Sequence, residues 1–389
     1  MPIKIIADRN IPQVEKAFAH IGEVELVDGR QLCADQLYDT QILVVRSVTQ
    51  VNQALLQDSP VRFVGSATIG TDHVDLDYLQ QRGIVFRNAP GCNAVSAAEY
   101  VVAALLNFTR RHQVLLEGLV VGIVGYGNVG SRVAARLSAL GCEIRAYDPP
   151  RQQQFNDRDY VSWDQIQAAD VVTAHVPLTK AGDYPTYQMF NQGFFSGLRD
   201  DALFINTSRG WAVDELALKQ VLATGKPLNL ILDVWQNEPT IDLELLAQTH
   251  IATPHIAGYS AEGKHRGLET IYHAACEFLG YQPQWSLAEA LPPHSFVIEP
   301  NLQLDDLSLV HSLVTQAYDI ERDDRALRKV CELPEAERGA GFDGLRKHYP
   351  VRREFAYHRV MLPRQRDKLA NCLSRLGFTI LHTAGPANA

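Results

Sequence analysis

Short apolar runs alternate with amphipathic stretches along the first 95 residues of the chain. Each run is three to five residues long, and a segment with the apolar spacing of a helix follows it. The alternation predicts a small doubly wound domain, in which parallel strands and helices follow one another. The predicted strands are Ile3–Ala7, Glu23–Val27, Ile42–Val45, Phe63–Gly65 and Val85–Arg87.

A long helix is predicted to follow this domain. Ser96 and Glu99 have the spacing of a capping box, so the helix should begin at Ser96. The run Tyr100–Leu106 behind them is almost wholly apolar, which is typical of a helix that is buried on all sides.

Residues 119–256 repeat the alternation with strands of their own, and a helix is predicted from Ser260 to Gly280. A third region begins near residue 295. It contains a predicted helix, then a polar, arginine-rich loop, then a strand, a helix and a strand, at Leu304–Tyr318, 338–353, Arg353–Leu362, Arg364–Leu376 and Phe378–Leu381. The whole chain is therefore expected to be α/β, with two doubly wound parallel-sheet domains and a small α+β domain at the C-terminus.

Composition and charge exclude several classes of protein. The 389 residues are 46% hydrophobic and 21% charged, which indicates a soluble globular protein of two or three domains. A net charge of −9 argues against a nucleic-acid partner. No apolar run approaches the roughly 18 residues that span a bilayer, and no signal region opens the chain. Six scattered cysteines fit reduced thiols better than disulfides or a zinc site, so we expect a cytoplasmic protein without a membrane partner.

A glycine-rich turn, GxGxxG, lies between the apolar strand Val120–Val124 and the predicted helix Ser131–Leu140. The first glycine permits a tight turn, the second lets the backbone approach a pyrophosphate, and the third allows the helix to pack closely on the strand. The motif alone also fits a turn without a nucleotide, but its position favours a dinucleotide. The predicted cofactor-binding residues are Gly125, Gly127, Asn128, Val129 and Gly130.

A carboxylate follows the next predicted strand, Glu143–Tyr147. At this position Asp148 would accept hydrogen bonds from the hydroxyls of the adenosine ribose, and it would repel a 2′-phosphate. The cofactor is therefore expected to be NAD and not NADP. Arg151, two residues after Pro149, is the side chain that could upset this preference.

Three polar residues each follow an apolar, strand-like run in the second half of the chain. Arg209, Asp233 and His255 would lie at the carboxyl ends of parallel strands, where ligands of such sheets bind. With Glu238 they form a set that suits hydride transfer at a carbon bearing a hydroxyl. A carboxylate bonded to an imidazole orients the ring for acid–base catalysis, and an arginine binds a substrate carboxylate in a planar fork. Taken singly, His255 could instead be a core histidine and Arg209 a surface ion-pair residue.

Three acids, Asp72, Asp75 and Asp77, flank His73. A metal site is conceivable, but the spacing matches no calcium loop, and helix capping is the favoured interpretation. No metal is therefore expected.

Four segments resemble the D-isomer-specific 2-hydroxyacid dehydrogenases, namely His175–Thr179, Asn206–Gly210, Leu232–Pro239 and Pro254–Gly258. The resemblance extends over roughly residues 1–285. It implies a flavodoxin-like substrate-binding domain at 1–95, completed by a helix at about 260–285, and a Rossmann NAD-binding domain at 96–259. One departure is Gln236, where many relatives have an acid.

The resemblance also implies roles for individual residues. The expected catalytic residues are Arg209, Glu238 and His255. The expected coenzyme contacts, beyond the glycine turn, are Val176, Thr207, Asp233 and Gly258. The expected substrate contacts are Ser47, Thr68, Arg209 and Tyr259.

Further segments, among them Val45–Thr49 and Gly65–His73, are similar to family members that act on a small phosphorylated 2-hydroxy acid and form a homodimer through a C-terminal domain, here 286–389. An acidic chain must supply local positive charge for a phosphate. We expect Arg46 to contact it and Arg346 to reach it, with the partner subunit's active site as one option. The plainer alternative is that Arg346 belongs to a solvated basic surface.

Two other functions remain open from the sequence. One is another dehydrogenase of the same family, acting on phosphoglycerate or glycerate. The other is an NAD-sensing binding protein without catalysis, since a fold does not determine a function.

Overall fold

The structure is a computed structural model of the chain, and it describes residues 2–155, 157–291 and 296–382. It divides into two compact units. The first consists of Met1–Asn93 and Tyr259–Pro293, and the second of Ala94–Gly258 and His294–Ala389. The chain therefore passes from one unit to the other at residues 93–94, 258–259 and 293–294.

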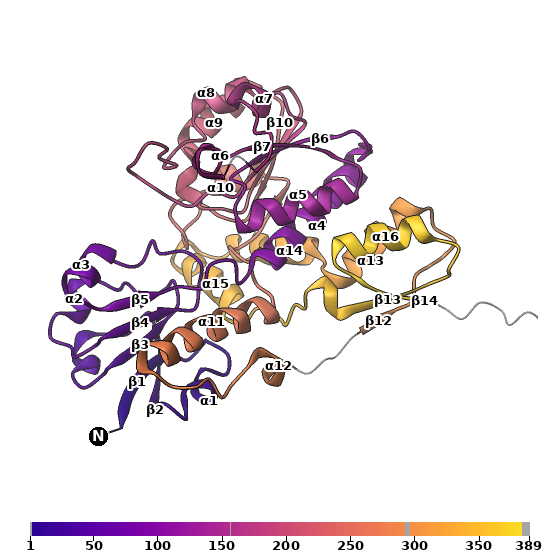
Figure 1. Cartoon of the computed structure of the whole chain (residues 1–389). Helices are drawn as coiled ribbons and strands as arrows, with labels where there is room; N and C mark the ends of the chain where they lie inside the picture. Colours follow the sequence, from indigo (N-terminus) through magenta and orange to yellow (C-terminus); the bar gives the residue numbers. More distant parts are fainter. Residues whose placement is uncertain (1, 156, 292–295, 383–389) are drawn as a thin grey trace, which may run out of the picture. The chain divides into compact units, whose positions relative to one another are not determined.

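Five parallel strands form the sheet of the first unit (Figure 1). Their spatial order is β2-β1-β3-β4-β5, so the strand order reverses at β1. This is the order of a flavodoxin-like sheet. All five predicted strands are confirmed within one residue at each end, as β1 (Ile3–Asp8), β2 (Gly22–Val27), β3 (Ile42–Val45), β4 (Phe63–Ser66) and β5 (Val85–Arg87).

The helix predicted from Ser260 to Gly280 is confirmed as α11 (Ala261–Leu279). The Ser260 side chain accepts the Gly263 N–H at its start, and Gly280 ends it in a left-handed conformation with φ 72°. The other helices of this unit are α1 (Val14–Phe18), the 3₁₀ helix η1 (Ala34–Leu37), α2 (Gln53–Leu56), α3 (Leu76–Gln81) and α12 (Leu287–Ala290).

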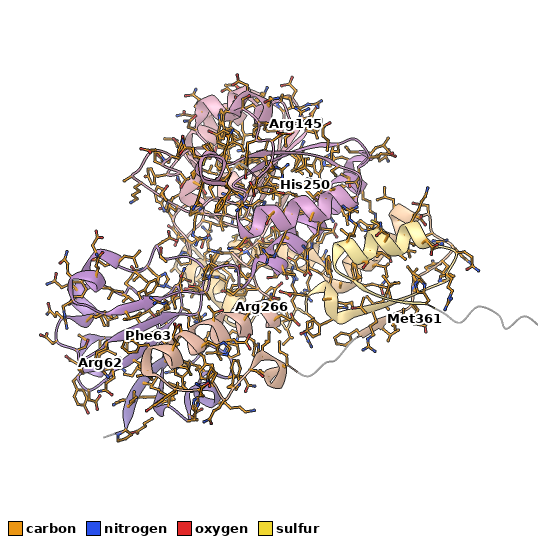
Figure 2. The ribbon with its side chains drawn as sticks, in the orientation of Figure 1. Arg62, Phe63, Arg145, His250, Arg266 and Met361 are labelled. Carbon is orange, nitrogen blue, oxygen red and sulfur yellow. The ribbon has the colours of Figure 1, made fainter. Side chains whose placement is uncertain are left out.

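Helix α11 packs closely on β4. A Cβ at Gly267 would lie 2.5 Å from the carbonyl oxygen of Ala67, so only glycine fits at this approach. Phe63 on β4 lies with its ring centroid 5.5 Å from that of Phe278 on α11 (Figure 2). Residues far apart in the sequence thus build the core of the first unit.

Six parallel strands form the large sheet of the second unit, in the order β11-β10-β9-β8-β6-β7. The order reverses at β6, which pairs with β7 on one side and β8 on the other. The carboxyl ends of β9, β10 and β11 therefore lie side by side. The strands are β6 (Val120–Val124), β7 (Glu143–Tyr147), β8 (Val171–Ala174), β9 (Ala202–Asn206), β10 (Leu228–Leu232) and β11 (Ile251–Ala252).

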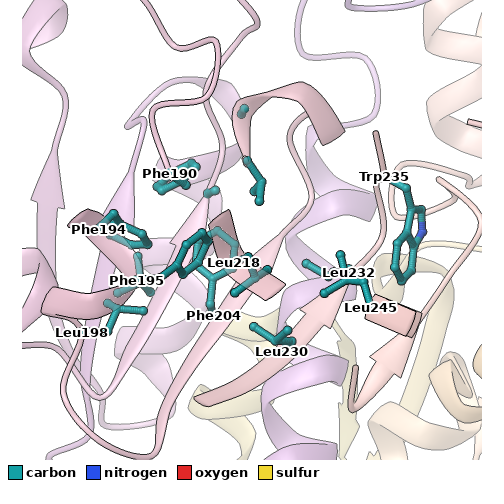
Figure 3. Close-up of a cluster of buried hydrophobic side chains, with 14 of the residues drawn as sticks. Phe190, Phe194, Phe195, Leu198, Phe204, Leu218, Leu230, Leu232, Trp235 and Leu245 are labelled. Carbon is teal, nitrogen blue, oxygen red and sulfur yellow. The ribbon is translucent and has the colours of Figure 1, made fainter. Parts of the chain in front are cut away.

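An aromatic cluster fills the core beside β9 (Figure 3). The ring centroids of Phe190 and Phe194 are 4.9 Å apart, and those of Phe195 and Phe204 are 5.3 Å apart, both edge to face. The helices along this sheet are α4 (Ala94–His112), α5 (Asn128–Ala139), α6 (Pro149–Phe155), α7 (Trp163–Gln167), α8 (Gln192–Gly197), the 3₁₀ helix η2 (Gly210–Ala212), α9 (Glu215–Ala223) and α10 (Leu243–Gln248).

The long helix predicted before this sheet is present as α4, but its predicted start is wrong. Because α4 begins at Ala94, Ser96 and Glu99 lie inside its first turns, and both are buried. The carboxylate of Glu99 accepts a hydrogen bond from the backbone N–H of Phe355 at 2.9 Å, 256 positions further along the chain. The side chain of Glu99, which the local pattern assigned to a helix cap, therefore makes a long-range tertiary contact instead.

The C-terminal part of the chain adds a separate sheet of parallel strands in the order β12-β13-β14, covered by α16 (Figure 1). This confirms a small domain of mixed helices and strands. Its described elements are β12 (Phe296–Ile298), α13 (Asp306–Ala317), α14 (Ile320–Cys331), α15 (Glu335–Lys347), the 3₁₀ helix η3 (Phe355–Tyr357), β13 (His358–Leu362), α16 (Asp367–Leu376) and β14 (Thr379–His382). They belong to the second compact unit, and the boundary predicted at residue 286 remains a prediction.

The arginine-rich loop predicted in this region is wrong, because most of that stretch lies in α15. Glycines at 339, 341 and 344 weaken the helical signal of its sequence, each by about 0.5–1 kcal/mol relative to alanine. Gly341 has a packing role that the sequence does not show. A Cβ there would lie 2.6 Å from Cγ1 of Val330 on α14, so glycine allows α15 to pack closely on α14.

Two further observations concern disulfide bonds and membrane-spanning helices. All six cysteines are free thiols, and Cys92 is buried. Among the helices of the described ranges, none is long and apolar enough to cross a bilayer.

Gly130→Ala should destabilise the second unit. Its Cβ would lie 2.0 Å from the carbonyl oxygen of Gly125, so α5 would have to move away from the turn after β6. We expect a loss of about 2 kcal/mol in the free energy of unfolding, as for other overpacked sites, measured by urea titration. Gly127→Ala is the control, because a Cβ there meets no atom within 4 Å. Equal stability of Gly130→Ala and Gly127→Ala would contradict this packing.

Candidate active site

The glycine-rich turn follows β6 at the point where the strand order of the large sheet reverses. Gly125 has φ +89°, and a Cβ there would lie 2.8 Å from the backbone of His175. The space beside Gly127 is open, and Gly127 is the N-cap of α5. Asn128, Val129 and Gly130 form the first turn of that helix, whose N–H groups have no partners within the helix. The turn thus has the geometry that a pyrophosphate requires.

Asp148 lies directly after β7, beside this turn. Its carboxylate accepts hydrogen bonds from the backbone N–H of Tyr126 at 2.7 Å and from that of Arg151 at 3.0 Å. A carboxylate offers about four lone pairs, so both oxygens retain capacity for ribose hydroxyls.

Two arginines lie near Asp148. The guanidinium of Arg151 is 2.5 Å from the carboxylate of Asp157, so its charge is paired with that acid. Arg158 was not predicted, and its guanidinium lies 4.2 Å from the ring centroid of Tyr126. An arginine on an aromatic ring has no short sequence signature, so only the fold could place it here.

Val176 and Thr207 lie at the ends of the neighbouring strands β8 and β9, and His175 connects them. The hydroxyl of Thr207 is 3.1 Å from Nδ1 of His175, and that of Thr173 is 3.0 Å from Nε2. Burial lowers the pKa of His175 to about 3, so the ring is neutral. A neutral imidazole between two hydroxyls holds these strand ends together without adding charge to the site.

His255 and Glu238 form a close pair. Nδ1 of His255 is 2.8 Å from Oε2 of Glu238, and the other carboxylate oxygen accepts the backbone N–H of Trp235 at 2.9 Å. Burial by itself would raise the pKa of Glu238, but the His255 ring, the charge of Arg346 and the Trp235 N–H outweigh it, and the pKa is lowered. Glu238 is therefore an anion that fixes the orientation of the imidazole.

The backbone at His255 is unusual. It has φ +56°, in the left-handed region that non-glycine residues rarely adopt. Asp233 accounts for this conformation. Its buried carboxylate accepts the Thr253 hydroxyl and the Ile256 N–H, each at 2.7 Å, and the Ala257 N–H at 2.9 Å. Burial raises the pKa of this carboxyl, and the donors around it act in the opposite direction.

Arg209 lies between β9 and η2. Its Nη1 donates to the Ser208 carbonyl oxygen at 2.8 Å. A Cβ at Gly210 would lie 1.9 Å from the carbonyl oxygen of Trp235, so the backbone beside Arg209 approaches the loop that carries Glu238. The structure therefore brings Arg209, Asp233, Glu238 and His255 to the ends of three neighbouring strands, β9, β10 and β11.

Helix α15 lies beside the same loop. A Cβ at Gly339 would be 3.4 Å from Cγ of Pro239, and the charge of Arg346 helps to lower the pKa of Glu238. Arg346 is thus close to the predicted active site of its own chain. Arg352, further along the same segment, is buried and donates to backbone carbonyl groups.

The remaining predicted substrate contacts lie in the first unit. Arg46 follows β3, and its Nε is 3.0 Å from the buried carboxylate of Asp8. Ser47 comes next in the chain, and the hydroxyl of Thr68, beyond β4, is 2.9 Å from that of Ser66. Tyr259 precedes α11.

Two further contacts were found, one at Tyr259 and one at His73. The ammonium group of Lys264 lies 4.5 Å from the ring centroid of Tyr259, a cation that the sequence reasoning missed. Asp75 caps α3 by accepting the N–H of Tyr78, as predicted, and His73 bonds to the Ser66 hydroxyl at 3.1 Å. Among the described residues, no cluster of acids, histidines and cysteines is suited to hold a metal ion.

Comparison with known proteins agrees with this geometry. The model of the D-isomer specific 2-hydroxyacid dehydrogenase family, NAD binding domain, matches residues 94–257, and that of a domain of unknown function, DUF3410, matches 291–377. Two solved structures share the fold. D-lactate dehydrogenase from Aquifex aeolicus, complexed with NAD and lactic acid, is 24% identical with a TM-score of 0.60, over 71% of this chain and 95% of its own. The 3-phosphoglycerate dehydrogenase of Entamoeba histolytica is 21% identical with a TM-score of 0.62, over 74% and 99%.

Similarity to curated proteins extends over nearly the whole chain. The erythronate-4-phosphate dehydrogenase of Proteus mirabilis (strain HI4320) is 43% identical, over 98% of this chain and 100% of the relative. That of Cronobacter sakazakii (strain ATCC BAA-894) is 44% identical, over 98% and 99%. The chain is therefore an NAD-dependent oxidoreductase, and it belongs to the D-isomer-specific 2-hydroxyacid dehydrogenases, in the family of the erythronate-4-phosphate dehydrogenases.

Proposed function

We propose that this protein oxidises C2 of 4-phospho-D-erythronate to give 2-oxo-3-hydroxy-4-phosphobutanoate, a step in the synthesis of pyridoxal 5′-phosphate. The observation that carries the proposal is the 2.8 Å pair of His255 and Glu238, with Arg209 at the end of a neighbouring strand. The names of the relatives that match over the full length support this substrate.

The geometry of the pair determines which nitrogen accepts the proton. Because Nδ1 of His255 bonds to the anionic Glu238, Nδ1 carries the hydrogen of the neutral ring and Nε2 carries the lone pair. Nε2 takes the proton of the C2 hydroxyl as the hydride leaves C2. Glu238 then stabilises the imidazolium that forms, and Arg209 binds the substrate carboxylate and stabilises charge on the C2 oxygen.

NAD supplies the hydride acceptor, and the residues around the glycine turn fit it. The space beside Gly127 admits a close pyrophosphate, and Asp148 is placed to accept the ribose hydroxyls. We assign the remaining coenzyme contacts to Val176, Thr207, Asp233 and Gly258. Both carboxylate oxygens of Asp233 already accept hydrogen bonds, so its contact would use a lone pair that these bonds leave.

We also propose that the chain forms a homodimer through its C-terminal part and that it acts in the cytoplasm. Phe296 and Val297, on the edge strand β12, are 57% and 54% exposed, and Leu302 and Leu307 are exposed nearby in the sequence. An exposed apolar edge strand of this kind is usually covered in the assembled protein. The six free thiols support a reducing compartment.

The substrate is tested by a panel of 2-hydroxy acids, each with and without a terminal phosphate. Arg46→Ala and Arg346→Ala should each raise the KM for the phosphorylated acid about tenfold or more and hardly change that for its unphosphorylated analogue, because one charge-assisted contact to phosphate would be lost. Lys347→Ala, exposed on the same helix as Arg346, is the control. Since Arg46 pairs with buried Asp8, the melting temperature of its variant is measured as well. An equal rise in the KM for the phosphorylated acid and for its analogue would show that these arginines have a structural role and do not bind the phosphate. Turnover of phosphoglycerate alone would overturn the proposed substrate.

The coenzyme preference follows from Asp148. NAD should be preferred over NADP by at least tenfold in kcat/KM, about 1.4 kcal/mol, because the carboxylate repels a 2′-phosphate. Asp148→Asn removes that charge and should narrow the ratio. Asp157→Asn is the comparison, because it removes a neighbouring charge that pairs with Arg151 and accepts the Tyr160 hydroxyl. Equal use of both coenzymes by the unmodified protein would contradict the role of Asp148.

The acid–base pair gives a prediction about pH. His255→Ala should lower turnover by roughly 100-fold or more. Glu238→Gln removes the anion that stabilises the imidazolium, so the acid limb of the pH–rate profile for oxidation should move to lower pH. Glu244→Gln, an exposed carboxylate paired with Lys219, should leave the profile in place. A profile that Glu238→Gln does not move would show that the two groups are not coupled.

A further inference from the structure

Arg352 lies in the extended segment between α15 and η3, within the residues that match the domain of unknown function. Its side chain is almost fully buried. Nη2 donates to the carbonyl oxygen of Ser96 at 2.7 Å, and Nη1 donates to that of Ala257 at 3.2 Å. One guanidinium group therefore joins the first turn of α4 to the residue before Gly258.

The surroundings of Arg352 keep its guanidinium in one orientation. The group lies 3.8 Å from the ring centroid of Tyr318, and Nη2 is 3.8 Å from the carboxylate of Glu99. An arginine that is stacked on a ring and bonded to two carbonyl groups presents a rigid planar fork of donors. Lysine has the same charge, but its three donors share one nitrogen, so it lacks the planar fork whose two nitrogens reach the two carbonyl groups.

The carbonyl group of Ala257 belongs to the turn that determines the position of His255. Asp233 holds this turn through the N–H groups of Ile256 and Ala257, at 2.7 and 2.9 Å. His255 itself has φ +56°, a strained conformation that persists only where its surroundings hold it. Asp233 holds the N–H groups of the turn, and Arg352 holds a carbonyl group of the same turn.

The two acceptors also lie beside two passages of the chain between the compact units. Ser96 comes shortly after residues 93–94, and Ala257 shortly before residues 258–259. A planar fork that bonds to both fixes the separation of the two segments within the second unit. Through these two bonds, Arg352 connects the C-terminal part of the chain to the backbone that follows His255.

We propose that Arg352 is a positioning residue of the active site, which holds the turn 255–258 through the carbonyl group of Ala257 and keeps His255 in its left-handed conformation. The C-terminal part of the chain thereby contributes to catalysis from within the same subunit. The kinetic consequence rests on the proposed function, while the effect on the turn does not.

The test uses Arg352→Lys in the full-length protein, because lysine keeps the buried positive charge beside Glu99. Arg353→Lys is the matched control, since Arg353 is also buried and stacks on the Tyr357 ring at 4.0 Å. Hydrogen exchange is measured on peptides covering residues 253–258, where the Ile256 and Ala257 amides bond to Asp233. We expect at least tenfold faster exchange in Arg352→Lys and no change in Arg353→Lys.

Kinetics supplies the second measurement. Arg352→Lys should lower kcat by about 10- to 100-fold, as expected for a misplaced catalytic group, and leave the KM for NAD within about twofold. The assay is run well below the melting temperature of each variant, so that loss of folded protein does not contribute. Unchanged exchange in the 253–258 peptides overturns the proposal. Faster exchange with an unchanged kcat would show that Arg352 holds the turn 255–258 but has no role in catalysis. Absence of activity in the unmodified protein would contradict the proposed function and leave the effect on the turn untouched.

Discussion

The buried carboxylate of Asp233 binds the backbone that follows β11, and the arrangement of the site depends on it. Three donors from residues 253, 256 and 257 surround it, and the carbonyl oxygen of Asp233 also accepts the N–H of His255 at 2.7 Å. A buried carboxylate with missing donors would be strongly unfavourable, so the strand end and the turn must form together. His255, in its left-handed conformation, lies between the residues that Asp233 binds.

Parallel strand order extends the constraint to the other reactive groups. Because β9, β10 and β11 are neighbours, the residues at their carboxyl ends meet at one edge of the sheet. Gly210 approaches the backbone of Trp235, and the Trp235 N–H in turn orients Glu238. At the next strand ends His175, neutral because it is buried, joins β8 to β9 without charge.

The C-terminal part of the chain contacts the same loops. Helix α15 approaches Pro239 through Gly339, and the charge of Arg346 favours the anionic form of Glu238. Arg352 bonds to the turn after His255. The residues that match a domain of unknown function are therefore part of the environment of the proposed acid–base pair, in addition to the dimer contact that we propose for them.

Local patterns in the sequence predicted the five strands of the first sheet, β6 and β7 beside the glycine turn, the apolar runs before Arg209, Asp233 and His255, and the helix that Ser260 caps, because each of these depends on neighbouring residues and on a regular period. Only the tertiary structure decided the partners of Glu99, the helix α15 and the two contacts of Arg352. Glu99 has the spacing of a cap, yet it bonds to a residue 256 positions away, and the glycines of α15 weaken its helical signal while they permit close packing. Contacts of this kind depend on which segments become neighbours in the folded chain, and hydrophobic periodicity contains no information about that.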